Sequence, residues 1–499
     1  MNMNEAWKRL LTRIYELRDL NSATALLHWD QAVMMPVRGG RSRAAAVATL
    51  EGLSHVRLTD PELGDLLDEL RSSNHLDDAQ EASVRVLGRY HDKAVRVPEK
   101  LVRELAHAQA DAYQAWTEAR PASDFEILQP HLERVVSLKK EEADARGHEG
   151  ERYDALLDNY EPGMTTSEVE GIFDLLVAGL RPLVDEVLGA IGGRPEWLSQ
   201  PFEETKQQAL CNWLVETVGF DLSAGRLDLS PHPFTSHIGF GDVRQTIRTE
   251  SNALLPSLYA TLHETGHALY EQGLPEDLAG LPAGGTPSLG MHESQSRLWE
   301  NLVGRSRAFT DFLLPQVKER FPSQVGMLTP EEFNAGVNHP ERSLIRVYAD
   351  ELTYNLHVAL RLELELAVFR DELDVADLPE AWDAGMEKHL GLRPDNEADG
   401  VLQDVHWSIG LHGYFPTYTL GTLYAAALYG KAMSDLPDLD DDLRSGETGR
   451  LLDWLRTNIH SQAYLRSAPE LAERVLGAPL STEPLLAYLG AKYRSLFVS

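Results

Sequence analysis

The sequence predicts a mainly α-helical fold with one small antiparallel β element. Apolar residues recur at three- and four-residue steps along most of the chain, which is the spacing of one helix face. Only residues 234–251 depart clearly from this pattern, because polar and apolar residues alternate there. The chain has 499 residues, of which 43% are hydrophobic, so it can bury a sizeable core.

The first clear helices are predicted in the N-terminal half. Residues 97–119 carry an apolar stripe, and Pro98 suits a first helical turn. Two candidate capping boxes, Ser123–Glu126 and Thr165–Glu168, predict the starts of two further helices. We interpret the stripes as core packing; they contain Leu101, Leu105, Ala108, Ala112 and Trp116 in the first helix, and Val169, Ile172, Phe173, Leu176 and Leu180 in the helix that begins at Thr165.

The β element is predicted within residues 234–251, which are rich in Gly, Thr and Ser and suggest one or two short hairpins. It directly precedes another predicted helix, whose apolar positions are Leu255, Leu258, Leu262 and Leu269. Farther along, the acidic, Pro-containing run Asp435–Asp442 is interpreted as a solvated loop rather than a cation site.

Composition excludes several classes of partner. A formal net charge of −32 argues against binding to nucleic acid or to an anionic membrane surface. The single cysteine, Cys211, permits no intrachain disulfide, and residues 1–20 lack the apolar core of a signal peptide. No apolar run is long enough to span a membrane. We therefore expect a cytoplasmic protein, and the acidic, Lys-poor composition suits a high-salt cytoplasm as well as an ordinary one.

One motif carries the chemistry, the sequence His263-Glu264-Thr265-Gly266-His267. Residues four apart lie one turn apart on the same helix face, so both imidazoles can bind one Zn²⁺. Glu264 is angularly offset from the two His, so it can take a proton from a water that the metal activates. Gly266 costs on the order of 1 kcal/mol in a helix, but it leaves room for another backbone to approach.

A catalytic zinc needs a third protein ligand and an open position. A third His directly downstream is excluded, because Tyr270 and Gly273 stand where that type of motif requires Gly and His. The segment 291–300 offers a ligand from a following helix. From spacing alone, Glu293, Glu300 and His292 are all candidates.

Six motifs also carry a resemblance to a known family. They are, in order, His232-Pro-Phe234, Asp242-Val-Arg244-Gln-Thr246, His263-Glu-Thr-Gly-His267, His292-Glu-Ser-Gln295, Ile345-Arg346-Val-Tyr-Ala-Asp350 and Gly400-Val-Leu-Gln403-Asp404-Val-His406-Trp407. Together they resemble the M32 family of metallocarboxypeptidases, the thermostable carboxypeptidase group, over nearly the whole chain from Ala25 to Tyr488.

The resemblance implies a large single-lobed helical fold with a deep active-site groove, a homodimer, and removal of single residues from peptides with a free C-terminus. It implies a single domain over residues 1–499, with residues 1–200 as an N-terminal helical part covering the groove and residues 201–499 as the catalytic part. It assigns the third metal ligand to Glu293, and hence one Zn²⁺ per subunit on His263, His267 and Glu293. Co²⁺ is a possible substitute, because such donor sets accept several first-row ions.

The resemblance also suggests roles in substrate binding and catalysis. Arg346 is expected to bind the C-terminal carboxylate of the substrate, since Arg binds carboxylates bidentately. The alternative for Arg346 is an ion pair with Asp350, four residues on. His406 and Tyr414 are expected to donate hydrogen bonds to the developing oxyanion, by analogy with related helical zinc peptidases.

Four further residues are expected to support or brace the site, namely Asp242, Arg244, Asp350 and Asp404. Asp404 is positioned to orient a His, while Asp242 and Arg244 are expected to pair with each other and brace the site. Tyr354 and Tyr418 are interpreted as packing residues. Two departures from the family pattern, His237 and His412, fall near the expected site and predict a change in subsite preference rather than in metal binding.

Two other functions fit parts of this pattern. The first is a dipeptidyl carboxypeptidase or an oligopeptidase with the same zinc chemistry. The second is a helical protein that binds zinc without catalysis, against which Glu264 argues, because a structural zinc site needs no general base beside its ligands.

Overall fold

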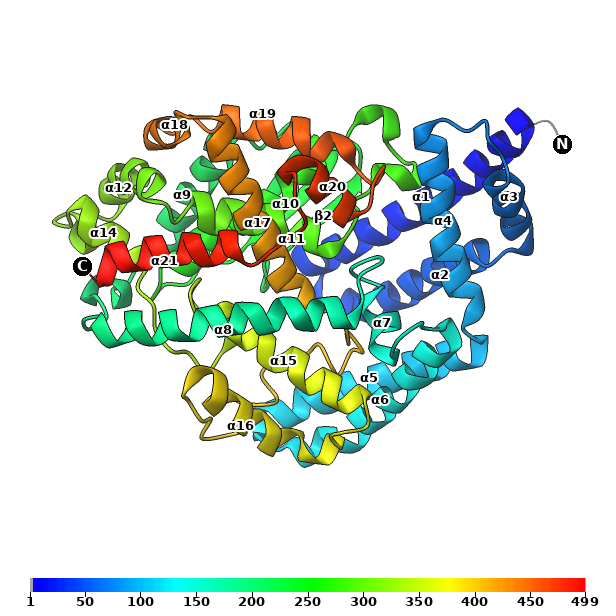
Figure 1. Ribbon diagram of the computed structural model, residues 1–499, viewed down its shortest axis with the longest axis horizontal. Coiled ribbons are helices and arrows are strands. Elements are labelled where there is room, and N and C mark those ends of the chain that lie inside the picture. The colour runs from blue at the N-terminus through cyan, green and yellow to red at the C-terminus, as the bar shows by residue number, and fades with distance from the viewer. Residues whose placement is uncertain (1–2, 499) are drawn as a thin grey trace.

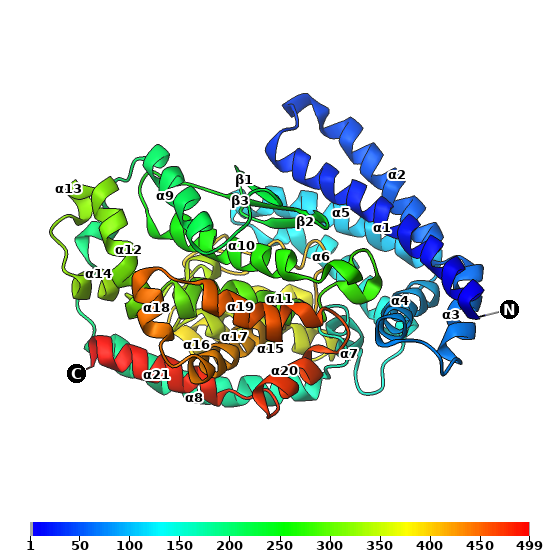
Figure 2. The same ribbon diagram turned by 90° about the horizontal axis from the view of Figure 1, so that it is seen from above.

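Helices form most of the molecule, as the apolar periodicity predicts. The computed structural model describes residues 3–498 and shows an elongated helical body (Figure 1). The first helices lie on one side of it, where α1 and α2 form a hairpin that projects from the rest (Figure 2). These N-terminal helices are α1 (Met3–Val33), α2 (Gly40–Leu58), α3 (Pro61–Arg71), α4 (Asp78–Arg96), α5 (Glu99–Ala122), α6 (Phe125–Arg146), α7 (Arg152–Leu157) and α8 (Thr166–Ala190).

The two predicted capping boxes have different outcomes. Thr165 caps α8, because its side chain accepts from the backbone N–H of Glu168 while Glu168 accepts from the N–H of Thr165. The box at Ser123 is wrong, since Ser123 has a left-handed backbone with a φ of 53° and ends α5. Asp124 has the extended backbone that an N-cap requires, and it caps α6 instead.

The predicted hairpin is confirmed, and a third strand joins it. β2 (Thr235–Gly239) pairs antiparallel with β3 (Asp242–Ile247). β1 (Gly225–Leu229), which follows α9 (Glu204–Thr217), pairs parallel with β3, so the sheet is mixed rather than purely antiparallel. Five residues are too few for β1 to show a clear period, and its partner lies beyond β2 in the chain.

Four helices lie at the centre of the part that follows the sheet: α10 (Leu255–Gly273), α11 (Leu289–Arg297), α15 (Tyr354–Phe369) and α17 (Pro416–Asp435). A π-helical turn, Leu298–Val303, directly continues α11. The remaining helices surround them: α12 (Arg307–Arg320), α13 (Pro322–Val325), α14 (Pro330–Val337), α16 (Leu378–Leu390), α18 (Leu439–Ser445), α19 (Gly449–Asn458), α20 (Ala468–Leu476) and α21 (Glu483–Phe497). Short 3₁₀ turns occur at Val37–Gly39, Glu196–Ser199, Glu276–Leu278, Pro282–Gly284, Arg346–Tyr348, Val375–Asp377 and His460–Gln462.

Core packing follows the predicted stripes. Leu101 and Leu105 of α5 and Phe173 and Leu176 of α8 are buried in one large hydrophobic cluster. The acidic run at residues 435–442 is not wholly a loop, because α18 begins at Leu439, although most of its carboxylates are exposed. Asp440, Asp441 and Asp442 lie in the first turn of α18, where negative charge favours a helix. No helix within residues 3–498 has both the length and the apolar character needed to cross a membrane.

Candidate active site

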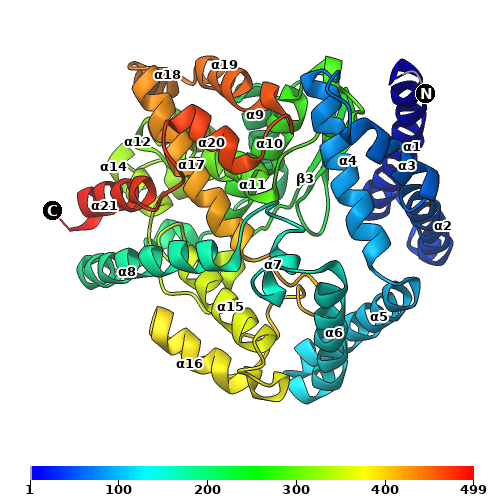
Figure 3. The ribbon, with the colours of Figure 1, turned by 45° about the vertical axis from the view of Figure 1, so that its right-hand side comes forward.

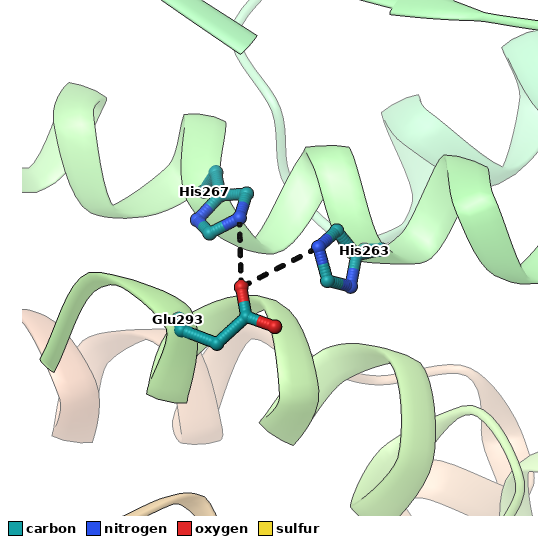
Figure 4. A group of neighbouring side chains, drawn as sticks. All are labelled: His263, His267 and Glu293. Atoms are coloured by element: carbon teal, nitrogen blue, oxygen red, sulfur yellow. Dashed lines mark ion pairs between the residues drawn. The ribbon is translucent and has the colours of Figure 1, made fainter. Parts of the chain in front are cut away.

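The two motif histidines and one carboxylate meet between α10 and α11. His263 and His267 project from α10 one turn apart, and Glu293 points towards them from α11 (Figure 4). Glu293 Oε2 lies 3.6 Å from His263 Nε2 and 3.3 Å from His267 Nε2. Leu258, Leu262 and Leu269 of α10 are buried in the core, which fixes the orientation of the helix.

Two glycines allow α11 to lie close enough for this arrangement. A Cβ atom on Gly266 of α10 would stand 2.5 Å from the carbonyl oxygen of Gln295 and 2.7 Å from Cα of Ser296. A Cβ atom on Gly421 of α17 would stand 2.6 Å from both Cβ and Cγ of Glu293. The expected close approach of a backbone at Gly266 is therefore present, and α11 packs between α10 and α17.

Hydrogen bonds orient both imidazoles. His263 Nδ1 lies 2.8 Å from Glu300 Oε2, and His267 Nδ1 lies 3.1 Å from the carbonyl oxygen of His292. With Nδ1 donating in each ring, both Nε2 atoms face Glu293. Two nitrogens and one carboxylate oxygen, all within 4.8 Å of one another, fit a tetrahedral divalent metal with one position left for water or substrate.

The geometry separates the three candidates for the third ligand. Glu300 lies in the π-helical turn and bonds the outer nitrogen of His263. His292 stacks its ring on that of His267, and its Nε2 lies 2.9 Å from Glu271 Oε1. Only Glu293 joins His263 and His267 in a group of three donors among the residues described.

Arg297 is a neighbour of the metal site that sequence reasoning gave no role. Its Nε donates to Glu293 Oε1 at 2.7 Å, and its guanidinium stacks on the ring of Tyr354 at 4.2 Å. Burial alone would raise the pKa of Glu293, but Arg297 and His263 hold it far below its ordinary value. The spacing of Glu293, Arg297 and Glu300 at i, i+4 and i+7 is the signal that could have revealed this cluster.

The two histidines differ in their electrostatics. Burial opposes protonation of His263, yet Glu293 and Glu300 raise its pKa to about 9. Burial, with the neighbouring His292, lowers the pKa of His267 to about 4. Glu293 and Glu300 therefore stabilise positive charge on the His263 ring.

Glu264 is positioned by the sheet. The hydroxyl of Thr235, on β2, lies 2.8 Å from Glu264 Oε2 and 2.9 Å from the backbone carbonyl of the same residue. Burial raises the pKa of Glu264, although His263 and Thr235 oppose this. A carboxylate with a raised pKa is suited to exchanging protons near neutral pH. Sequence reasoning assigned no role to Thr235, so its contact with Glu264 was missed.

Arg346 is buried and pairs with Asp404, not with Asp350. Its Nη2 lies 2.7 Å from Asp404 Oδ1, and its Nη1 donates to the hydroxyl of Tyr354 at 3.0 Å. Asp350 instead accepts from the backbone N–H groups of Leu352 and Thr353, which shapes the entry into α15. The alternative of an Arg346–Asp350 ion pair is therefore wrong, because the chain turns between the two residues rather than forming one helix.

Asp404 binds two arginines at once. Its second oxygen, Oδ2, accepts from Arg361 Nε at 2.7 Å, and Arg361 is fully buried. Burial opposes ionisation, but the two arginines hold the pKa of Asp404 far below its ordinary value. Asp404 also lies 3.7 Å from His406 Nδ1, so it is placed beside a His as expected, while its main partners are Arg346 and Arg361.

His406, Tyr414 and Tyr418 form one cluster. The ring of Tyr414 lies 5.6 Å from that of His406 and 5.3 Å from that of Tyr418. His406 Nε2 lies 3.3 Å from the hydroxyl of Tyr418, so Tyr418 does more than pack. Burial lowers the pKa of His406 to about 4. Burial and the nearby Glu293 raise the pKa of Tyr414 to about 12, so Tyr414 keeps its proton and can donate it in a hydrogen bond.

Glu365 holds the loop that carries this cluster. Its carboxylate accepts from Trp407 Nε1 at 2.7 Å, from the N–H of Gly413 at 2.9 Å and from the hydroxyl of Tyr153 at 2.6 Å. Sequence reasoning missed Glu365 because it lies among core residues of α15, more than 40 positions from the loop.

Asp242 and Arg244 pair as predicted, with Arg244 Nε 2.8 Å from Asp242 Oδ1. The guanidinium of Arg244 lies 4.3 Å from the ring centroid of Trp29, which connects β3 to α1. His237 Nδ1 lies 2.9 Å from Glu271 Oε2, so it reaches the partner of His292. His412 is buried against Phe369 in the loop held by Glu365.

The arrangement combines a metal-binding group, an adjacent carboxylate, a Tyr and a His that carry polar hydrogens, and a buried arginine. This combination suits hydrolysis of a peptide or amide carbonyl.

Comparison with known proteins agrees with this chemistry. Residues 9–493 match the family model described as carboxypeptidase Taq (M32) metallopeptidase. The chain is 46% identical to thermostable carboxypeptidase 1 of Thermus thermophilus, with 100% of both chains covered. It is 33% identical to carboxypeptidase 1 of Bacillus subtilis, again over 100% of both. The structure of an M32 carboxypeptidase from Deinococcus radiodurans matches with a TM-score of 0.97 and 41% identity, covering 99% of this chain and 100% of that one.

Proposed function

Because this chain belongs to the carboxypeptidase Taq (M32) family of metallopeptidases, we propose that it removes single amino acids from the free C-termini of peptides with broad specificity. Membership makes it a metallocarboxypeptidase and hence a hydrolase. The more specific part of the proposal concerns the metal, the roles of individual residues and the size of the released product.

The observation that carries the proposal is the group His263, His267 and Glu293, with Glu264 beside it. We assign one Zn²⁺ per subunit to these three donors, with Co²⁺ as a possible substitute. When bound, such a metal acts as a Lewis acid that makes water more acidic and polarises the scissile carbonyl. The outer hydrogen bonds to Glu300 and to the His292 carbonyl support this assignment, because they hold each imidazole in one tautomer.

In this proposal Glu264 accepts a proton from the attacking water and later gives it to the leaving amine. Tyr414 and His406 donate hydrogen bonds to the oxygen that becomes negative as the carbonyl is attacked. The proton that Tyr414 keeps, with its pKa near 12, supports this role.

Arg346 is proposed to bind the C-terminal carboxylate of the substrate. Its contacts with Asp404 and Tyr354 fix the guanidinium in one orientation. They use only part of its five N–H donors, so others remain for a carboxylate. Asp404 positions Arg346 in this scheme, and Arg361 balances the charge of Asp404.

A dipeptidyl carboxypeptidase or an oligopeptidase would use the same metal group and differ in where the substrate ends. Glu264 argues against a non-catalytic zinc protein. Burying its carboxylate destabilises the fold, and a structural zinc site does not require such a carboxylate beside its ligands. The homodimer, the cytoplasmic location and the division at residue 200 stay predictions.

The deciding experiment is a digest of two matched peptides. Purified, zinc-loaded protein is incubated with an N-terminally blocked peptide and with its C-terminally amidated twin, and both are followed by mass spectrometry. We expect successive losses of single residues from the free acid only, because the amide removes the charge that Arg346 would bind.

Loss of two residues at a time would instead identify a dipeptidyl carboxypeptidase. Internal cleavage of both peptides would identify an oligopeptidase and remove the proposed role of Arg346. Cleavage of neither peptide, with zinc bound, would favour the non-catalytic alternative.

A further inference from the structure

A cavity lined by basic side chains lies outside the active site, between α4 and the segment that follows α7. Figure 3 shows where α4 and α7 lie in the fold. It is open to solvent and has a volume of about 490 Å³. Its basic residues are Arg71 at the end of α3 and Arg85, Arg89, Lys93 and Arg96 on α4.

The α4 residues share one face of the helix. Their positions, 85, 89, 93 and 96, follow one another at steps of four and three, which is the repeat of one face of a helix. That face contacts the end of α6 and the residue that follows α7. Arg89 and Lys93 reach Asp158, and Arg96 donates to the backbone carbonyl of Arg146 at 3.0 Å.

Positive charge exceeds negative charge in this cavity. Only two carboxylates line it: Asp92, which lies 2.7 Å from Arg71, and Asp158, which is shared by Arg89 and Lys93. Five cations therefore face two anions, in a chain whose formal net charge is −32. A local excess of this sign opposes the charge of the whole molecule.

Backbone carbonyls accept hydrogen bonds from some of the remaining N–H groups of these basic side chains, but they do not neutralise the positive charge. Arg85 donates to the carbonyls of Tyr464 and Leu465 at 2.9 and 3.1 Å. Arg85 also lies on the rim of a neighbouring cavity that contains Glu81 and Glu470. Even if Arg85 is assigned to that second cavity, four cations face two carboxylates in the first.

The state of Lys93 agrees with a deficit of negative charge. Burial, and then the nearby Arg89, lower the pKa of Lys93 to about 8, although Asp158 acts in the opposite direction. An anion in the cavity would favour the charged form of Lys93, because an opposite charge at short range stabilises an ammonium group.

We propose that this cavity binds a small multivalent oxyanion of the phosphate type. Guanidinium groups form two parallel hydrogen bonds to phosphate oxygens, and Lys93 adds a compact charge. The volume is larger than one phosphate requires, so the bound group is either a free anion or the phosphate of a larger molecule. The site involves none of the residues assigned to catalysis.

Isothermal titration calorimetry of the full-length, zinc-loaded protein with inorganic phosphate tests this, in chloride buffer of constant ionic strength. We expect saturable binding. The site variant is Arg89→Gln with Arg96→Gln, because Asp158 then keeps Lys93 as a partner. Loss of two charge-assisted contacts should weaken binding by roughly tenfold or more.

The matched control is Arg103→Gln with Arg134→Gln, which removes the same charge from exposed arginines paired with Glu99 and Glu104. Its affinity should equal that of the unmodified protein. Arg96→Gln alone, at an exposed position, serves as the second site variant if the double variant fails to fold, and it should also weaken binding.

Absence of saturable binding in the unmodified protein would overturn the proposal. So would equal affinity in the site and control variants, because phosphate bound to the catalytic metal is indifferent to Arg89 and Arg96. A parallel titration with a nucleoside monophosphate separates the two sources of the anion. Tighter binding than phosphate indicates the phosphate group of a larger ligand, and weaker or equal binding indicates the free anion.

Discussion

His263, Glu264 and His267 of α10 are each held by a polar group that comes from a different element. The imidazole of His263 on α10 bonds Glu300 of the π-helical turn, and Glu264 bonds Thr235 of β2. A buried polar group without a partner costs on the order of 1–3 kcal/mol, so these contacts also stabilise the fold around the site. At the scale of the residue, the same hydrogen bonds fix the position of each side chain and influence its protonation.

Substituting Glu264→Gln keeps the shape of the side chain and removes the carboxylate proposed as the base. We expect kcat to fall by roughly 100- to 10,000-fold, because Gln accepts no proton from water. Metal content, measured by atomic emission on the purified variant, should stay at one equivalent per subunit, since Glu264 is not among the three metal donors.

The control for that variant is Glu276→Gln, an exposed residue beyond the end of α10 that should leave kcat unchanged. Activity of the Glu264→Gln variant at the level of this control would refute the assignment of the base.

His412 makes stability depend on pH. Burial, assisted by Lys139, lowers its pKa to about 3, while an unfolded His titrates near 6.5. Below pH 6.5 the unfolded chain therefore binds a proton that the folded chain does not, so the free energy of unfolding decreases as pH falls from about 6.5 towards 3.

Replacing His412→Phe removes this loss and retains an aromatic side chain against Phe369. We compare the free energy of unfolding of the variant with that of the unmodified protein. This difference should shift in favour of the variant by about 2 kcal/mol between pH 8 and pH 5. Urea unfolding at the two pH values measures the difference. If the difference in free energy of unfolding between variant and unmodified protein is the same at both pH values, His412 titrates normally in the folded state.

At the scale of the element, α11 is the helix whose placement matters most. It carries Glu293, it continues into the π-helical turn with Glu300, and it packs against Gly266 of α10 and Gly421 of α17. π-Helical turns are rare and often mark functional sites, which agrees with the role of Glu300 beside His263.

Substituting Gly266→Ala should separate α10 from α11. The added Cβ would meet the backbone of Gln295 at 2.5 Å, and a backbone atom cannot move aside as a side chain can. We expect a loss of about 2 kcal/mol or more in the free energy of unfolding, together with weaker metal binding, because Glu293 moves with α11. Thermal unfolding and competition with a chelator measure the two effects.

Gly171→Ala on α8 is the matched control, since its new Cβ would meet nothing within 4 Å. Alanine is the better helix former, so that variant should be as stable as the unmodified protein or more stable by up to about 1 kcal/mol. If Gly266→Ala is equally stable, backbone contact at residue 266 does not limit the distance between α10 and α11.

For the whole molecule, the dominant electrostatic feature is the net charge of −32. Like charges spread over the surface repel one another and destabilise the folded state, and salt screens that repulsion. Each surface ion pair contributes little to stability, so salt removes little stability by screening these pairs. Salt should add more stability by screening the repulsion among the excess negative charges.

The melting temperature should therefore rise when NaCl increases from about 0.1 M to about 1 M, where the Debye length is only about 3 Å. Differential scanning calorimetry measures the shift, and KCl at the same concentrations serves as the control for ion-specific effects. A melting temperature that falls in both salts would show that attractive ion pairs, and not repulsion, dominate.

Much of the site was predictable because its chemistry is local in sequence. The pattern at residues 263–267 requires only that the segment be helical for His263 and His267 to share a face, and the same logic placed Asp242 beside Arg244. The helices at residues 97–119 and 165–180 were predictable from apolar periodicity, because burial of one face is what stabilises a helix in a protein.

What the sequence left open are contacts between segments far apart in the chain. Spacing could not choose among Glu293, Glu300 and His292, since that choice depends on how close α11 lies to α10, which Gly266 and Gly421 set. Spacing likewise suggested Asp350 as a partner for Arg346, whereas folding brought Asp404, 58 positions away, to that guanidinium.

The strand β1 and the brace formed by Glu365 were missed for the same reason, because short-range patterns carry no record of a distant partner. The sequence by itself therefore determined the helical class and the motif at residues 263–267, from which the proposed metal ligands and base follow. Tertiary structure alone decided which carboxylate lies beside His263 and His267 and which residues hold it, because this depends on packing distances between helices.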